Sequence, residues 1–122
     1  MATFTNLDGH RYISLVTYRQ NGERVPTPVW FADENGTLYV ITLAISGKVT
    51  RIRNNAQVEV APCTNIGDVL GDAIPAMARV LQGEDEIKLA DSALERKYGE
   101  EKARAAANSS TLELVFLAIR PA

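Results

Sequence analysis

The amino-acid sequence predicts a mainly β fold, a six-stranded antiparallel β-barrel with flanking helices, in a single domain that spans residues 1–122. Two observations support this prediction. Six short apolar segments are separated by tight turns, which is typical of small antiparallel barrels. Helical patterns occur only between the third and fourth segments and between the fifth and sixth. Because strands and helices do not alternate, we do not expect a doubly wound parallel sheet.

Composition narrows the classes of function. The chain is 46% hydrophobic and 23% charged, as expected of an ordinary globular domain. Its formal net charge of −2 argues against nucleic-acid binding over a whole face. The one cysteine, Cys63, excludes an internal disulfide framework, and the one histidine, His10, excludes a multi-histidine metal site. No segment has the apolar length of a signal peptide or a membrane span, so we expect a cytoplasmic protein with no membrane partner.

The first two expected strands form a hairpin. Residues 11–19 carry apolar side chains on both faces, and Asn21-Gly22 is typical of a tight turn. The second expected strand covers residues 24–32 and contains Pro26 and Pro28. Because N–H groups two residues apart point to the same edge of a strand, both prolines remove donors from one edge. That edge is expected to be unpaired, either as a protected sheet edge or because it faces a ligand.

A third strand begins near Leu38, after a second turn at Asn35-Gly36, and leads into a short helix. Ser46 is a suitable N-cap for that helix, which is expected to continue to about Arg53. Its side chain is expected to accept hydrogen bonds from the free N–H groups of the first turn. Val49 and Ile52 are three residues apart and are expected to share the buried face.

The other face of this helix predicts an anion site. Lys48 and Arg51 are also three residues apart, and a helix N-terminus attracts anions through its free N–H groups and its dipole. Gly47 would let a ligand approach the backbone. We call Ser46, Gly47, Lys48 and Arg51 the phosphate site; the alternative is a capped surface helix with solvated cations. A P-loop is excluded, because Thr42 and Val49 replace its first Gly and its Ser/Thr.

The second half of the chain completes the barrel. Residues 57–63 are expected to form the fourth strand, and residues 69–81 a fifth that is interrupted by Gly71 and Pro75. Arg79 lies in this apolar strand, where it is expected either to pair with an acid or to reach a cofactor of a partner subunit.

A helix is expected between Gly83 and Gly99, and a second short one over residues 100–107. The buried face of the helix between Gly83 and Gly99 is expected to carry Ile87, Ala90, Leu94 and Tyr98, which recur at helical spacing. The charged residues from position 84 to 104 are interpreted as a solvated helix face. The last strand, residues 111–120, is apolar on both faces, which predicts either a barrel wall covered from outside or a subunit interface.

Three sequence blocks resemble one known family. They are LVTYRQNGERVPTPVWF (residues 15–31), GTLYVITLAISGKVTRIRNNAQVEVAPC (36–63) and MARVL (77–81). Their order and spacing resemble the pyridoxamine 5'-phosphate oxidase-like FMN-binding split-barrel family, in particular its small deazaflavin (F-420)-dependent branch. The resemblance implies a six-stranded antiparallel split barrel, a homodimer with cofactors at its interface, and either coenzyme F-420 or FMN as the cofactor.

The resemblance also implies roles for individual residues. In the family, a T-x-x-x-S-x-K pattern after the third strand holds the cofactor phosphate; Thr42, Ser46 and Lys48 match it here, with Gly47 and Arg51 beside them. The family's second strand lines the flavin ring, which implies Thr27, Pro28, Val29 and Trp30. The oxidases proper carry Arg at the position of Gly47 and a C-terminal Trp-and-Arg segment, so oxidase activity itself is not implied.

These features lead to three hypotheses. The preferred one is an oxidoreductase that transfers a hydride between bound coenzyme F-420 or FMN and a small organic substrate. The second is a non-catalytic FMN-binding or cofactor-sequestering protein, and the third is a barrel that binds single-stranded nucleic acid, against which the acidic balance counts. No catalytic side chain and no metal site is expected. His10 is interpreted as a solvated residue and Cys63 as a buried, inert thiol.

Overall fold

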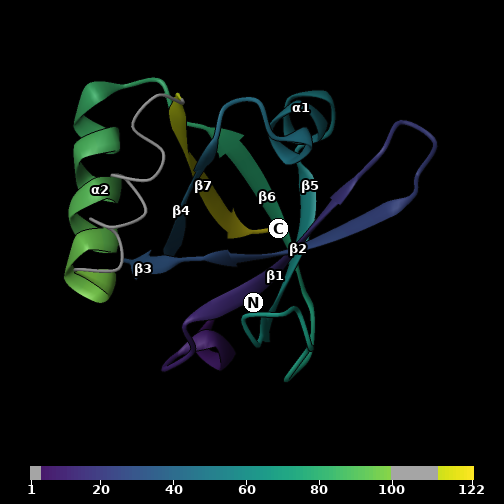
Figure 1. Ribbon diagram of the computed structural model, residues 1–122, viewed down its shortest axis with the longest axis horizontal. Helices are drawn as coiled ribbons and strands as arrows, with labels where there is room; N and C mark the ends of the chain where they lie inside the picture. Colours follow the sequence, from purple (N-terminus) through teal and green to yellow (C-terminus); the bar gives the residue numbers. More distant parts are fainter. Residues whose placement is uncertain (1–3, 100–112) are drawn as a thin grey trace.

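The computed structural model describes residues 4–99 and 113–122. All strands of this part form one antiparallel sheet in the order β2-β1-β5-β6-β7-β4-β3 (Figure 1). Along the chain the elements are a 3₁₀ turn η1 (Thr5–Leu7), β1 (Tyr12–Tyr18), β2 (Arg24–Trp30), β3 (Ala32–Glu34), β4 (Thr37–Leu43), α1 (Gly47–Asn54), β5 (Gln57–Cys63), β6 (Ile74–Val80), α2 (Glu84–Tyr98) and β7 (Leu114–Pro121). The mainly β prediction is confirmed.

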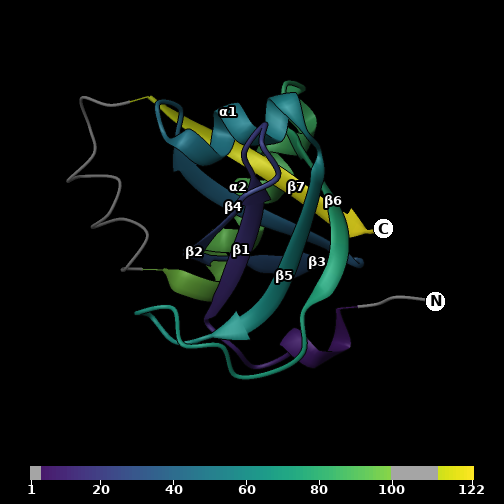
Figure 2. The ribbon, with the colours of Figure 1, turned by 90° about the vertical axis from the view of Figure 1, so that its right-hand side faces the viewer.

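The sheet has seven strands where the sequence predicted six. The expected second strand breaks at Phe31 into β2 and β3, which lie at opposite ends of the sheet. One residue therefore joins the first and last strands, and the sheet must curl to bring its ends together. In Figure 2, β4 and β7 accordingly cross behind β1 and β5 instead of continuing a flat layer. This curled sheet is a split barrel.

Strand β2 is an edge strand, as its two prolines predicted. Pro26 lies opposite Val16 and Pro28 lies opposite Ser14, both in β1, and the other edge of β2 pairs with no strand of the described residues. The missing N–H donors thus fall where no neighbouring strand needs them.

The structure corrects the start of the fifth expected strand and confirms the second turn. The strand expected from residue 69 begins only at Ile74; before it, Val69 makes a single isolated bridge to Cys63. The turn at Asn35-Gly36 is confirmed, with φ of 54° and 83°, the positive values that a type I′ hairpin requires.

The expected helix over residues 100–107 lies outside the described residues. No helix within the described ranges has the length and apolarity to cross a bilayer.

Both faces of β7 are buried within this chain at residues 117–119. Leu117 and Ile119 point into the barrel core, where Ile52 of α1 also packs, whereas Ala118 packs under α2. Figure 1 shows α2 along the outside of β3, β4 and β7. The covered barrel wall is therefore confirmed for residues 117–119, whereas Leu114, Val115 and Phe116 are only half-buried, so the subunit interface stays a prediction.

An ion pair fastens the start of α2 to the sheet. Arg79 of β6 donates to both carboxylate oxygens of Glu86, at 2.8 and 2.7 Å, and the Tyr39 hydroxyl donates to the same carboxylate at 3.1 Å. The hydrogen bond from Arg79 lowers the pKa of Glu86. Arg79 therefore pairs with an acid of its own chain, which decides the alternative that the sequence left open.

Candidate functional site

A cavity of about 680 Å³ opens between the edge of the barrel and its two helices. This volume lies in the range of small-molecule sites. Its walls come from six elements, so the site exists only once the sheet has curled. The lining residues are Tyr12, Pro28, Val29, Trp30, Ile41, Thr42, Leu43, Lys48, Ile87, Lys88, Asp91, Leu114 and Phe116.

The cavity gathers five of the nine residues that the resemblance implied. Pro28, Val29 and Trp30 enter it from the edge strand β2, Thr42 from the end of β4, and Lys48 from the first turn of α1. The other four are not among its lining residues. Three of them, Ser46, Gly47 and Arg51, lie beside Lys48 at or near the start of α1, whereas Thr27 is half-buried in β2.

Ser46 occupies the N-cap position of α1, as predicted, but its side chain does not cap the helix. Its backbone is extended (φ −68°, ψ 148°), and its carbonyl accepts a hydrogen bond from the Val49 N–H at 3.2 Å. Its hydroxyl makes no cap hydrogen bond, and its buried Oγ has no hydrogen-bond partner among the described residues. The expected side-chain cap is therefore wrong, and the hydroxyl is left without a described partner at the start of the helix.

Arg51 is held over the first turn of α1. Its Nε donates to the hydroxyl of Thr17, a fully buried residue of β1, at 2.6 Å. Its guanidinium then lies so close to Gly47 that a Cβ atom there would be 2.6 Å from Nη1. The absence of a side chain at Gly47 thus leaves Arg51 room in this position, a role that differs from the predicted close approach of a ligand.

The charges of this turn are uncompensated. Burial, and then the neighbouring charge of Arg51, lower the pKa of Lys48. Burial, and then Arg19, lower the pKa of Arg51. Among the residues that the structure describes, no carboxylate forms an ion pair with either cation, and the first turn of α1 has no acidic residue. Two partly buried cations beside the N–H groups of a helix start favour the binding of an anion such as a phosphate.

Beyond this cationic end, the cavity is mostly apolar. Ile41 and Leu43 of β4, Leu114 and Phe116 of β7, and Ile87 of α2 contribute its walls. A flat ring could bury its faces against such walls, with Trp30 beside it.

Helix α2 contributes more to the cavity than the sequence predicted. Lys88 and Asp91, three residues apart, line the wall next to Ile87, although they were assigned to a solvated helix face. Lys88 is exposed, as that interpretation expects, but Glu86, Asp91 and Lys97 are half-buried, so it is wrong for these three. The sequence signal for these polar residues was weak. The spacing of apolar residues locates the centre of the buried stripe of a helix, but it does not show which polar residues beside that stripe will face a cavity.

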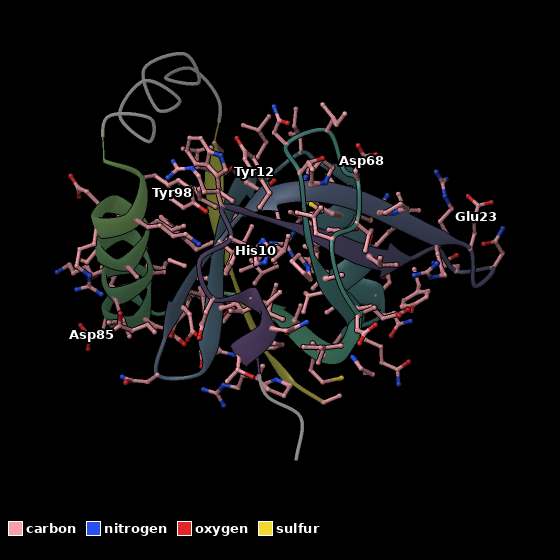
Figure 3. All side chains as sticks on the ribbon, turned by 90° about the horizontal axis from the view of Figure 1, so that it is seen from below. His10, Tyr12, Glu23, Asp68, Asp85 and Tyr98 are labelled. Atoms are coloured by element: carbon pink, nitrogen blue, oxygen red, sulfur yellow. The ribbon has the colours of Figure 1, made fainter. Side chains whose placement is uncertain are left out.

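The indole of Trp30 is stacked on the ring of Tyr98, the last residue of α2. The two ring centroids are 4.6 Å apart and the planes differ by 10°. Figure 3 shows Tyr98 and Tyr12 near each other at this end of the molecule; the Tyr98 hydroxyl lies 2.6 Å from the carbonyl of Arg11. The helical spacing predicted that Tyr98 is buried, but it did not predict that Tyr98 packs against Trp30 of β2.

Lys97 lies on the other side of this cluster. Its Nζ is 3.4 Å from the centroid of the Phe31 ring. Burial, and then the charge of Arg11, lower the pKa of Lys97 to about 8, against the opposing effect of Asp33. This lysine therefore lies next to the strand break, outside the set of residues that line the cavity.

Neither His10 nor Cys63 lines the cavity. Cys63 is buried, and burial followed by the charge of Asp68 raises the pKa of its thiol, which makes it a poor nucleophile. The described residues contain no group of three or more His, Cys, Asp and Glu side chains that could hold a metal ion.

Comparison with solved structures gives matches over nearly the whole chain. A FAD-binding protein of Mesorhizobium loti has a TM-score of 0.72 at 17% identity, covering 95% of this chain and 82% of its own. A candidate pyridoxamine 5'-phosphate oxidase of Listeria innocua has a TM-score of 0.66 at 19% identity, covering 94% and 86%. HutZ, the haem storage protein of Vibrio cholerae, has a TM-score of 0.68 at 14% identity, covering 93% and 83%.

No protein-family model matches the sequence, and no curated protein matches it significantly. At identities below 20%, the structural matches show the fold and leave the ligand to be argued from this chain's own residues. The chain has the split-barrel fold, which it shares with proteins named for a flavin, for pyridoxamine phosphate oxidation and for haem.

Proposed function

We propose that this protein binds a flavin or deazaflavin nucleotide in the cavity and acts as an oxidoreductase. The bound coenzyme F-420 or FMN would exchange a hydride with a small organic substrate. One observation carries the proposal: Lys48 stands at one end of a cavity whose remaining walls are mostly apolar, with a second uncompensated cation, Arg51, on the same helix just outside the lining. A ring with a phosphate at the end of a flexible chain has the complementary shape and charge.

The residues divide between the two ends of such a ligand. At the phosphate end, Lys48 and Arg51 would supply charge, while the Ser46 hydroxyl and Thr42 would donate hydrogen bonds. Gly47 would keep the space that Arg51 needs. At the ring end, the second strand would pack along the flavin through Thr27, Pro28, Val29 and Trp30. The flavin supplies the hydride chemistry when bound, while the protein orients it and excludes water.

The cavity favours a flavin over haem. Haem iron is normally held by His, Cys, Met or Tyr, and Tyr12 is the single residue of these types among those that line the cavity. The start of α1, by contrast, would supply phosphate recognition through Lys48 and Arg51. The second candidate function, a protein that stores FMN without turnover, uses the same site and differs only in the fate of a bound substrate.

We also propose that the protein is a homodimer. Ile66, Val69 and Leu70 expose 76%, 60% and 55% of their surfaces in the loop after β5. This loop lies against the cavity residue Pro28, since a Cβ atom on Gly67 would be 3.9 Å from its ring. A second copy that covered this apolar loop would extend the wall of the cavity. Light scattering should report about twice 13.3 kDa, and a stable monomer that binds flavin tightly would contradict the dimer.

Titration of the purified protein with FMN, coenzyme F-420 and hemin tests the proposal. We expect saturable binding of FMN or F-420, followed by absorbance and fluorescence, and weaker binding of hemin. Tight hemin binding without flavin binding would overturn it. Anaerobic oxidation of the reduced cofactor by a panel of small electron acceptors then separates an enzyme from a storage protein.

A further inference from the structure

The side chain of Tyr98 takes the place of a strand partner at Phe31, where the chain passes from one edge of the sheet, β2, to the other, β3. Phe31 belongs to neither β2 nor β3, and its N–H donates to the Tyr98 hydroxyl at 2.9 Å. The same hydroxyl lies 2.8 Å from the Phe31 carbonyl and 2.6 Å from the Arg11 carbonyl. Buried backbone groups need such partners. The last residue of α2 therefore holds the backbone at the break.

The ring of Tyr98 also fixes the residue before the break. It stacks almost parallel on the indole of Trp30, with centroids 4.6 Å apart. Trp30 lines the cavity, whereas Tyr98 is only 4% exposed and does not. The ring of Tyr98 is itself flanked by Arg11 and Lys97, whose charged groups lie 5.1 and 5.4 Å from its centroid. Tyr98 thus supports the indole from behind, without lining the cavity itself.

We infer that Tyr98 is a positioning residue for the cofactor, acting through Trp30. By its ring it sets the plane of the indole that the flavin ring meets, and by its hydroxyl it fixes the backbone that carries the indole. Without the stacked ring, the indole would gain rotamers that project into the cavity or leave it open. This inference rests on the proposed function, but its first step, the hold on Trp30, belongs to the protein without any ligand.

The chain allows a direct test because Trp30 is its single tryptophan. Tryptophan emission and its quenching by acrylamide therefore report on residue 30 alone. Three variants are compared with the wild type: Tyr98→Leu removes the ring, Tyr98→Phe removes only the hydroxyl, and Tyr39→Leu is the control. Tyr39 is equally buried and contacts Glu86 of α2, at the opposite end of the helix from Tyr98.

We expect Tyr98→Leu to increase acrylamide quenching of the free protein and to weaken FMN binding by about two- to ten-fold, the loss of one aromatic stack. We expect Tyr98→Phe to keep the wild-type FMN affinity within about two-fold, because it retains the stack. The control should leave Trp30 quenching unchanged. Denaturant unfolding of each variant shows how much protein is folded.

Unchanged Trp30 quenching in folded Tyr98→Leu would overturn the inference, whether or not FMN binds. Altered quenching with unchanged FMN affinity would also overturn it, since Tyr98 would then be structural only. If no variant and no wild-type protein bound FMN, the proposed function would fail while the quenching data still decided the hold on Trp30. If Tyr98→Leu did not fold, a loss of FMN affinity beyond about ten-fold in Tyr98→Phe would overturn the role of the ring.

Discussion

A Cβ atom on Gly47 would lie 2.6 Å from Nη1 of Arg51, so a side chain at residue 47 would force the guanidinium to shift. Gly47→Ala should displace the guanidinium and weaken FMN binding by about ten-fold, the loss of one charge-assisted contact. The unfolding free energy should change by less than about 1 kcal/mol, because alanine favours the helix while the bond to Thr17 weakens.

Gly83→Ala is the matched control, since Gly83 is the N-cap of α2 and a Cβ there would meet nothing within 4 Å. It should leave FMN affinity at the wild-type value. Equal affinity in Gly47→Ala, measured by fluorescence titration, would show that Arg51 does not contact the phosphate.

Ser46→Ala should have opposite effects on the free and the bound protein. The buried Oγ has no partner among the described residues, and an unsatisfied buried hydroxyl costs about 1–3 kcal/mol. Its removal should therefore stabilise the free protein by up to about 1 kcal/mol in denaturant unfolding, while FMN affinity falls several-fold. A variant that loses stability and keeps FMN affinity would show that the hydroxyl serves the fold and not a ligand.

The sequence predicted the local elements that depend on nearest neighbours. Helix α2 runs between Gly83 and Gly99, and α1 starts after Ser46, because caps and apolar spacing are properties of short segments. The edge position of β2 also followed from the two prolines alone, since they remove donors from one side of the strand.

What the sequence missed depends on contacts between distant segments. The break at Phe31 has no glycine or proline to mark it; it is stabilised by Tyr98, 67 residues later. Likewise, Thr17 positions Arg51, and Lys88 and Asp91 enter the cavity only because α2 crosses the outside of β4 and β7. No local pattern predicts which strand a helix will cover.

Lys97 should make stability depend on pH in the alkaline range. Its pKa in the folded protein is about 8, below the ordinary 10.5, so the unfolded state binds more protons between these values. The free energy of unfolding should therefore rise with pH across this window, whereas below pH 8 both states are protonated and the contribution is constant.

Lys97→Met isolates this effect from the other groups that titrate there. From pH 8 to 10.5 the wild type should gain on the order of 1 kcal/mol relative to the variant, a value reduced for solvent screening of a half-buried group. Urea unfolding at several pH values measures the difference. Parallel curves for the two proteins would contradict the lowered pKa.

Turnover, where a substrate is found, should not depend on the two reactive side chains that the sequence offers. His10 and Cys63 lie outside the cavity lining, so His10→Ala and Cys63→Ala should keep the turnover number within about three-fold of wild type, compared with the 10²–10⁴-fold loss of a general acid or base. Trp30→Ala should impair turnover because Trp30 lines the cavity. A hundred-fold loss in the His10 or Cys63 variant, with cofactor affinity unchanged, would reveal a catalytic group.

The most direct measurement of the central claim compares FMN with riboflavin, which has the same ring and no phosphate. The wild type should prefer FMN, and Lys48→Ala and Arg51→Ala should each weaken FMN binding by about ten- to a hundred-fold with little effect on riboflavin. Arg53→Ala, which removes an exposed cation of the same helix, is the control. In the Lys48→Ala/Arg51→Ala double variant the preference for FMN should disappear. A double variant that still preferred FMN as strongly as the wild type would show that the phosphate binds elsewhere.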